Sequence, residues 1–197
     1  MSEIHHRVKN NFEIISNLVE MTSMRIENQE IQGLLGDARA RIYSMALVHS
    51  QLYQNDRFDR IYMEKHIKEL IDYLIYIYGN KEGRIGTTIE SSEVYLSVSQ
   101  AVPCALVLNE LIANAFKHAF VKEGQGNVQV SMDNIDDDTI LLRVRDDGDG
   151  IPEGVEHKEA TGLGLKLVRH LVAGQLKGEM LVNNENGTEV CVKFKKF

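Results

Sequence analysis

The hydrophobic pattern of this chain changes its period near residue 58, and this change limits the folds that the chain can adopt. Before this point, apolar residues recur at spacings of three and four over residues 4–26 and again over residues 35–52, as in amphipathic helices. Beyond it, runs that alternate with period two are interleaved with helical runs. We therefore predict an α+β protein with two domains: a helical hairpin over residues 1–58 and an α/β sandwich over residues 59–197, with helices on one face of the sheet.

The hairpin carries more apolar surface than its two helices can cover. The first helix has an inner stripe and, beside it, a flank that contains Ile14, Leu18 and Met21. The inner stripe consists of Val8, Phe12, Ile15, Val19 and Ile26. Pairing with a second copy would bury the flank, so we predict a homodimer through residues 1–58, built as a four-helix bundle.

In the second domain, the patterns predict an order of helices and strands. Helices are expected from Met63 to Leu74, over residues 100–120 and over residues 164–176. Strands are expected over residues 85–90, 128–132, 140–144, 180–182 and 190–194, and the last two form a hairpin across the turn at residues 184–187.

Composition excludes several classes of protein. The formal net charge of −7 and the pI near 5.5 give no electrostatic basis for binding nucleic acid. Cys104 and Cys191 are far apart and lack the spacing of zinc ligands, which is typical of an intracellular chain. No signal peptide or run of about 18 apolar residues is found, so we expect a cytoplasmic location and no membrane span.

Asp146 is the most informative single residue. It continues the alternation of Ile140, Leu142 and Val144, whose side chains should all lie on one side of the strand, so it is expected to face the apolar side. A buried carboxylate needs a polar partner, such as the amine of a ligand. In the alternative interpretation, the strand ends earlier and Asp146 is a solvated turn residue before Asp147.

Two glycine-rich segments follow. Gly148 and Gly150 lie directly after Asp146, and Gly162 and Gly164 open a predicted helix, where backbone N–H groups can face phosphates. The P-loop and dinucleotide-binding fingerprints are both absent, and arginines occupy the first two ligand positions that a calcium loop would need.

Four polar residues share one face of the helix predicted over residues 100–120. Glu110, Asn114, Lys117 and His118 follow spacings of four, three and one, and their oxygens and cations could hold Mg²⁺ and a triphosphate. An ordinary solvated helix face is the alternative. The opposite face is apolar and consists of Cys104, Leu108, Leu111, Ile112 and Ala115.

The first helix carries two adjacent histidines. A rotation of about 100° per residue places His6 about 160° from the inner stripe, on the same outer stripe as Asn10, whereas His5 lies only about 60° away. His6 is therefore the more accessible imidazole, although two ordinary helix residues would give the same pattern.

Five motifs now occur in a fixed order, and together they resemble the catalytic core of sensor histidine kinases of the HRxxN subfamily. Residues 3–15 (EIHHRVKNNFEII) resemble the phosphoacceptor helix and residues 41–53 (RIYSMALVHSQLY) the second helix. Residues 109–119 (NELIANAFKHA) are similar to the N-box, and DDGDG and TGLGL to the two glycine boxes. The similarity covers nearly the whole chain and implies an ATPase domain of the GHKL type.

The resemblance implies a role for each motif residue. His6 would be the phosphoacceptor, with Asn10 and Glu110 as further catalytic residues, and Asn114 with Glu110 would hold Mg²⁺. Lys117 and His118 would contact phosphate. The adenine amine would bind Asp146, supported by Thr188, and the residues bordering the nucleotide would be Gly148, Gly150, Gly162, Leu163 and Gly164.

The chain departs from the wider family at two points. Arg7 stands where larger families place an acidic residue, which leaves the proton acceptor for His6 unidentified. The stretch over residues 151–161 is short for an ATP lid. Since the chain begins five residues before His6, we also expect an upstream sensor domain that this chain lacks.

The function implied is ATP-dependent autophosphorylation of a histidine, followed by transfer to an aspartate of a response-regulator receiver domain. A GHKL ATPase that uses Glu110 to activate water, an anti-sigma-type serine kinase and a non-enzymatic dimerisation module are the alternatives. The HHRVKNN segment and the glycines near Asn114 and Asp146 favour the histidine kinase.

Overall fold

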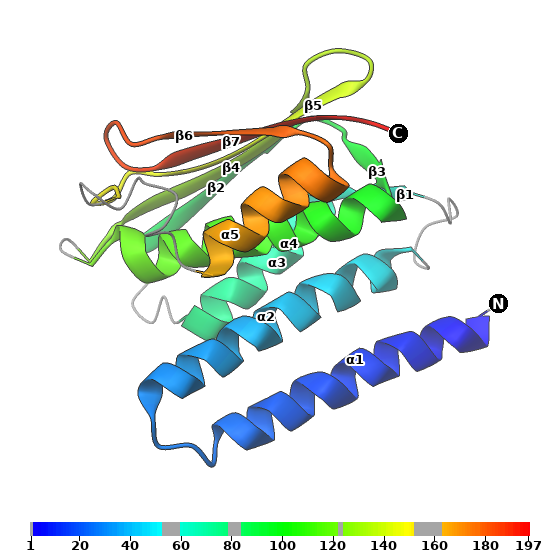
Figure 1. Ribbon diagram of the computed structural model, residues 1–197, viewed down its shortest axis with the longest axis vertical. Helices are drawn as coiled ribbons and strands as arrows, with labels where there is room; N and C mark the ends of the chain where they lie inside the picture. The colour runs from blue at the N-terminus through cyan, green and yellow to red at the C-terminus, as the bar shows by residue number, and fades with distance from the viewer. Residues whose placement is uncertain (1, 53–59, 79–83, 122–123, 152–162) are drawn as a thin grey trace.

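A computed structural model of the chain describes residues 2–52, 60–78, 84–121, 124–151 and 163–197. Its helices and strands stack in layers: a sheet, then a layer of helices that covers one sheet face, then an N-terminal helical hairpin (Figure 1). The order along the chain is α1 (Ser2–Ser23), α2 (Gln29–Gln51), β1 (Arg60–Tyr62), α3 (Met63–Tyr78), β2 (Ile85–Ser91), β3 (Tyr95–Ser97), α4 (Val98–Asn114), η1 (Ala115–Ala119), β4 (Gly126–Asn134), β5 (Thr139–Asp146), α5 (Leu163–His170), η2 (Leu171–Gln175), β6 (Glu179–Asn183) and β7 (Glu189–Lys195). The predicted α+β class is confirmed.

The predicted helical hairpin is confirmed, with a shorter first helix. Helix α1 ends at Ser23, so the prediction that it continues to Ile26 is wrong. The Asn28 side chain accepts hydrogen bonds from the backbone N–H groups of Glu30 and Ile31, which begins α2. Ile15 is 46% exposed, so its assignment to the inner stripe is wrong for this hairpin.

A five-stranded sheet forms the centre of the second domain, in the order β2-β4-β5-β7-β6. Strands β2 and β4 are parallel, and the other neighbouring pairs are antiparallel. Helices α3, α4 and α5 cover one face of this sheet, as predicted (Figure 1). The short antiparallel pair β1–β3 was missed, because three-residue strands carry too little alternation to be recognised.

The apolar core continues from the sheet through the helical layer into the hairpin. Ala40, Leu47 and Val48 of α2 belong to the same buried cluster as Leu108 of α4 and Val144 of β5. The residues of α4 and η1, Val98–Ala119, form the one candidate membrane span among the described residues, by length and composition only. Since 72% of its most apolar window is buried, it fits a core helix equally well.

Two helices end in a turn of π-helix, which the sequence did not predict. Helix α4 passes into η1 at Ala115, and α5 passes into η2 at Leu171. Side chains in a π turn project at different angles from those of an α-helix, and such turns are frequent at functional sites. The predicted helices over residues 100–120 and 164–176 are therefore present, but their last turns place side chains differently.

Candidate nucleotide site

Asp146 lies at the end of β5 and faces the helical layer. Its side chain is only 6% exposed, so the predicted inward parity is confirmed and the solvated-turn interpretation is wrong. One carboxylate oxygen, Oδ1, accepts hydrogen bonds from the backbone N–H groups of Gly148 and Thr188, both at 3.1 Å. The backbone N–H of Asp146 also donates to the Thr188 carbonyl at 2.9 Å. Thr188, the residue just before β7, thus fixes Asp146 in place, and its supporting role for adenine stays a prediction.

The protonation of Asp146 reflects these contacts. Burial raises the pKa of its carboxyl, and the hydrogen bonds from Thr188 and Gly148 act in the opposite direction. A buried carboxylate with one oxygen committed to backbone donors can offer its second oxygen to a ligand N–H group. The site is therefore suited to bind an amine donor.

At two positions around Asp146, close backbone contacts leave no room for a side chain and so require glycine. Gly187 has φ +100°, and a Cβ atom there would lie 2.0 Å from the Asp146 carbonyl oxygen. A Cβ atom at Gly148 would lie 2.0 Å from the Ala119 carbonyl oxygen at the end of η1. The glycine-rich turn therefore packs directly against the end of the N-box helix.

The start of α5 lies beside the same helix. A Cβ atom at Gly164 would lie 2.6 Å from Glu110 Oε2 and 3.9 Å from the Asn114 amide nitrogen. Glu110, Asn114 and Gly164 are thus brought together from segments about fifty residues apart. Gly150 has φ +71°, and the next residue, Ile151, exchanges hydrogen bonds with the Asn184 side chain, which holds the end of the turn.

The four polar residues of the N-box helix do not form one solvated stripe. Glu110 is buried, and its carboxylate accepts hydrogen bonds from Arg41 Nε at 2.7 Å and Arg41 Nη2 at 2.9 Å. Lys117 donates to Asp37 Oδ1 at 2.7 Å. Asn114 is half-buried, and His118 is exposed in η1, where desolvation and then the Lys117 ammonium lower its pKa.

Several residues that contact this site were missed by sequence reasoning. Asp37 and Arg41 come from α2, and Tyr78 from α3 donates its hydroxyl to Asp37 at 2.7 Å. Nothing in their local sequence indicates contacts with residues 41 to 80 positions away. Asn109 could have been recognised, because it precedes Glu110 in the N-box. Its amide donates to Glu110 Oε1 at 3.1 Å, and its own buried oxygen has no hydrogen-bond partner.

The predicted phosphoacceptor lies far from these residues along the chain. His5 and His6 are in the first turns of α1, but their side chains lie outside the described residues, as does that of Leu163. Asn10 is exposed on α1, as expected for the outer stripe. Gly162 falls within residues 152–162, which the structure does not describe.

The donors near the N-box suit Mg²⁺ better than softer metals. Asn114 offers an amide oxygen, and Glu110 a carboxylate once Arg41 has moved away. No group of three or more histidine, cysteine, aspartate or glutamate side chains in the described ranges could hold a metal. One or two protein oxygens are enough for Mg²⁺, since that ion keeps waters and takes its other ligands from phosphates.

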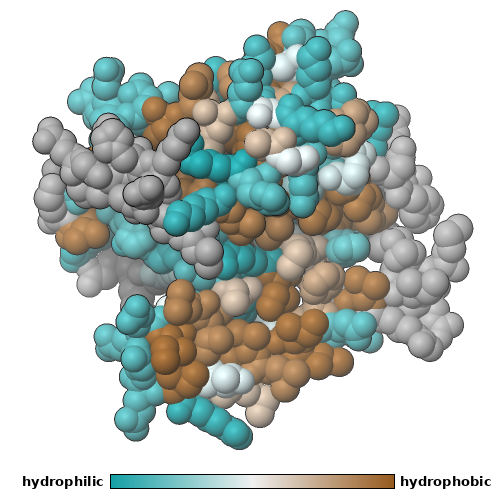
Figure 2. All heavy atoms as spheres, in the orientation of Figure 1, coloured by the Kyte–Doolittle hydropathy of each residue, from teal (hydrophilic) through white to brown (hydrophobic). Residues whose placement is uncertain are grey.

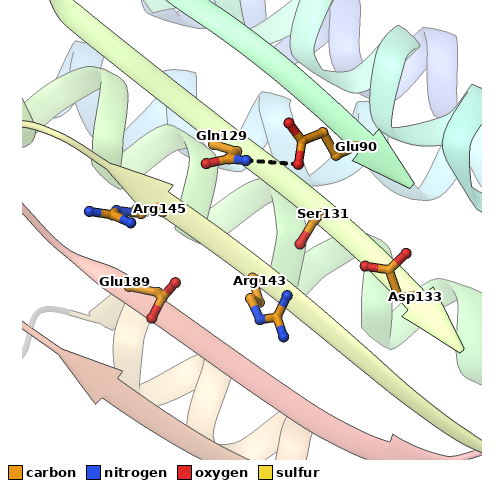
Figure 3. Close-up of a pocket in the computed structure, with 7 residues that line it drawn as sticks. All are labelled: Glu90, Gln129, Ser131, Asp133, Arg143, Arg145 and Glu189. Carbon is orange, nitrogen blue, oxygen red and sulfur yellow. Dashed lines mark hydrogen bonds between the residues drawn. The ribbon is translucent and has the colours of Figure 1, made fainter. Parts of the chain in front are cut away.

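A separate hollow lies on the opposite face of the sheet. Figure 3 shows its lining side chains, which come from four neighbouring strands: Glu90, Gln129, Ser131, Asp133, Arg143, Arg145 and Glu189. Gln129 donates to Glu90 at 3.0 Å. Because Arg143 and Arg145 alternate with inward-facing Val144 and Asp146, this hollow has no access to the candidate nucleotide site.

Comparison with known proteins decides the family. A family model described as histidine kinase matches residues 3–78. A second, described as the histidine kinase-, DNA gyrase B- and HSP90-like ATPase, matches residues 99–196. The chain belongs to the sensor histidine kinases. Its predicted domain boundary at residue 58 stays a prediction, and residues 53–59 lie outside the described part.

Relatives of this kinase core include the sensor histidine kinase PdtaS of Mycolicibacterium smegmatis, which is 31% identical over 97% of the chain. The chain spans 38% of that relative's length. The solved histidine kinase domain of the Erythrobacter litoralis blue-light-activated histidine kinase is 25% identical, with a TM-score of 0.73 over 98% of this chain and 89% of that one. An anti-sigma F factor of Bacillus licheniformis is 38% identical over 53 residues, 27% of this chain and 36% of that protein.

Proposed function

We propose that this chain transfers the γ-phosphoryl group of MgATP to His6 and then to an aspartate of a response-regulator receiver domain. The observation that carries the proposal is the Asp146 turn. There, a buried carboxylate is held by Gly148 and Thr188, in a glycine-rich turn that packs against the end of the N-box helix of a histidine kinase.

In this proposal each group has one task in the reaction. Asp146 accepts a hydrogen bond from the adenine amine, and Asn114 with Glu110 holds the metal. Lys117 and His118 contact the phosphates. Mg²⁺, when bound, offsets negative charge on the phosphate oxygens. The neutral imidazole of His6 attacks the γ-phosphorus in line, so that an N–P bond forms, the bond to the bridging oxygen breaks and ADP leaves.

We also propose a homodimer through the helical hairpin. Large apolar side chains remain exposed along α1 and the start of α2, namely Ile14, Ile15, Leu18, Met21, Met24, Ile31 and Leu34. Figure 2 shows this apolar surface as a continuous brown area over the hairpin. Exposed apolar patches of this kind mark interaction surfaces, and a second copy would bury them in a four-helix bundle.

The cellular setting completes the proposal. A cytoplasmic location provides both MgATP and the receiver-domain partner, and an upstream sensor domain would supply the signal. Both are proposals. The relative PdtaS is itself described as a sensor histidine kinase.

One observation bears on the GHKL ATPase alternative. A glutamate that activates water needs a free carboxylate oxygen, and both oxygens of Glu110 accept hydrogen bonds from Arg41, so this alternative, like the metal role of Glu110, requires Arg41 to release the carboxylate first. The similarity to an anti-sigma F factor keeps the serine-kinase alternative open over 27% of the chain. That alternative predicts an acid-stable phosphoserine on a partner and requires no histidine on α1.

The deciding experiment is incubation with labelled ATP, followed by acid and base treatment of the product. We expect acid-labile, base-stable label in the wild type and none in His6→Gln, while His6→Gln binds ATP normally. His5→Gln is the matched control and should lose only part of the label. Phosphohistidine that persists in His6→Gln and maps to His5 by peptide mass spectrometry would refute the assignment.

A further inference from the structure

Two ion pairs join the hairpin to the N-box, and both come from the same face of α2. Asp37 and Arg41 are one helical turn apart. Asp37 accepts from Lys117, and Arg41 donates two hydrogen bonds to Glu110. Because Glu110 and Lys117 are the two charged N-box residues assigned to the metal and the phosphates, α2 and MgATP require the same side chains.

These contacts are partly buried. Both oxygens of Glu110 accept hydrogen bonds from the Arg41 guanidinium, and these bonds raise the pKa of Arg41 against the effect of burial. Asp37 also accepts the Tyr78 hydroxyl, and the Lys117 ammonium lies 5.0 Å from the centre of the Tyr78 ring. The Arg41–Glu110 pair is bidentate, and the Lys117–Asp37 pair is supported by the Tyr78 ring and hydroxyl. Partly buried pairs of this kind are stronger than solvated ones, so α2 should hold the charged groups of Glu110 and Lys117 firmly.

The position of the contacts along the hairpin also matters. Phe12 and His49 have ring centroids 5.6 Å apart, and Glu20 pairs with Arg39 at 2.8 Å, so position 6 of α1 lies a few residues beyond the level of the C-terminal end of α2. Arg41 precedes that end, Gln51, by ten residues, an offset of ~15 Å along the helix axis. Figure 1 agrees: the N-terminus lies at one end of the hairpin, and the start of α5 lies toward the other.

We infer that Asp37 and Arg41 form an autoinhibitory latch, which holds the N-box charges on α2 and the nucleotide site away from His6. In a four-helix bundle whose two-fold axis runs along the helices, position 6 of the partner lies at the same height along the axis as position 6 of this chain. The distance along the axis between Arg41 and the acceptor histidine is therefore the same for His6 of either chain. Binding of MgATP and release of the latch then favour each other. This inference rests on the proposed function for the identity of the acceptor and of the nucleotide.

The test compares Asp37→Asn and Arg41→Gln with Arg39→Gln. Arg39 is the matched control, because it lies on α2 but pairs with Glu20 of α1 instead of the N-box. Breaking either latch pair should lower the Kd for a non-hydrolysable MgATP analogue by about three- to tenfold and raise the initial rate of His6 phosphorylation by a similar factor. Arg39→Gln should change each by less than about twofold.

Two further variants keep the test decisive if Arg41→Gln is poorly folded. Tyr78→Phe removes only the hydroxyl that supports Asp37, and Arg41→Lys keeps the charge but not the bidentate geometry. Both should shift the Kd in the same direction by less than Asp37→Asn does. Analogue affinities equal to that of Arg39→Gln, or weaker binding in Asp37→Asn and Arg41→Gln, would overturn the latch. If the wild type forms no phosphohistidine, the proposed function fails, and the binding measurements still decide the latch.

Discussion

Replacement of Asp146 by asparagine tests the candidate site most directly. Asparagine keeps an oxygen that can accept from the backbone N–H groups of Gly148 and Thr188, so the turn should be preserved. The second carboxylate oxygen becomes an NH₂ group, which donates hydrogen bonds. A donor would then face the donor of the adenine amine, and the charge that strengthens the original contact is lost.

The expected loss is the energy of one charge-assisted hydrogen bond in a buried setting, about 1.5–3 kcal/mol, or roughly ten- to hundredfold in Kd. Asp147→Asn is the control. Asp147 is exposed on the opposite parity, and its Oδ1 accepts from the backbone N–H of Asn127 at 2.6 Å. Its substitution should change nucleotide affinity by less than about threefold, since an exposed side chain contributes little.

Isothermal titration with ATP and thermal unfolding of each variant would provide both measurements. Because burial raises the pKa of Asp146, ATP affinity of the wild type should fall on acidification at a higher pH than an ordinary aspartate would cause. Asp146→Asn should lack this component. Equal losses of affinity in Asp146→Asn and Asp147→Asn, with both variants folded, would refute the assignment of adenine binding to Asp146.

Four other predictions follow from the described contacts. Asn114→Ala should stay folded but lose the enhancement of nucleotide binding by Mg²⁺, and normal enhancement in a titration with and without the metal would reassign that role to Glu110. Gly187→Ala should lower stability by about 1–3 kcal/mol in urea unfolding, because its positive φ and its contact with the Asp146 carbonyl exclude a side chain. Gly33→Ala on α2 has nothing within 4 Å of the new Cβ atom and should raise stability by about 0.5–1 kcal/mol, so a lower melting temperature would contradict it. Burial lowers the pKa of His66 to about 4, so as the pH falls below 6.5 the unfolded chain is protonated before the folded one. The free energy of unfolding should therefore drop by about 2 kcal/mol between pH 7.5 and 5, and this drop should be absent in His66→Leu.

The elements of the second domain were predictable because local patterns determine them. Val144 and Asp146 alternate with exposed residues on β5, which was enough to place the carboxylate on the inner face. The turn at Gly187 was likewise readable as a hairpin from residues 184–187. In both cases the decisive interactions lie within a few residues or on an adjacent strand.

The environment of the N-box could not be predicted in the same way. Helical spacing correctly separated Glu110 from the apolar residues Leu108 and Ile112, and an open, solvated face was the natural expectation. The partner of Glu110 is Arg41, 69 residues earlier, and nothing in either segment encodes that contact. The π turn at Ala115–Ala119 also changes the direction of Lys117, and the helical spacing of the sequence did not predict it.

This division between local and distant contacts bears on regulation. The hydrogen bonds of Asp146 come from Gly148 and Thr188 of the ATPase domain, so the adenine contact proposed for it should not depend on docking of the hairpin. Glu110 and Lys117 are shared with α2, so only the metal and phosphate end of the nucleotide competes with the hairpin. Since coupling between two binding events is reciprocal, the factor by which docking of α2 weakens triphosphate binding should equal the factor by which MgATP weakens docking, and a signal that loosens α2 should strengthen triphosphate binding by at most this factor. ADP, which lacks the γ-phosphate, should therefore release the hairpin less than ATP does, and loss of ADP after transfer would return the domain to α2.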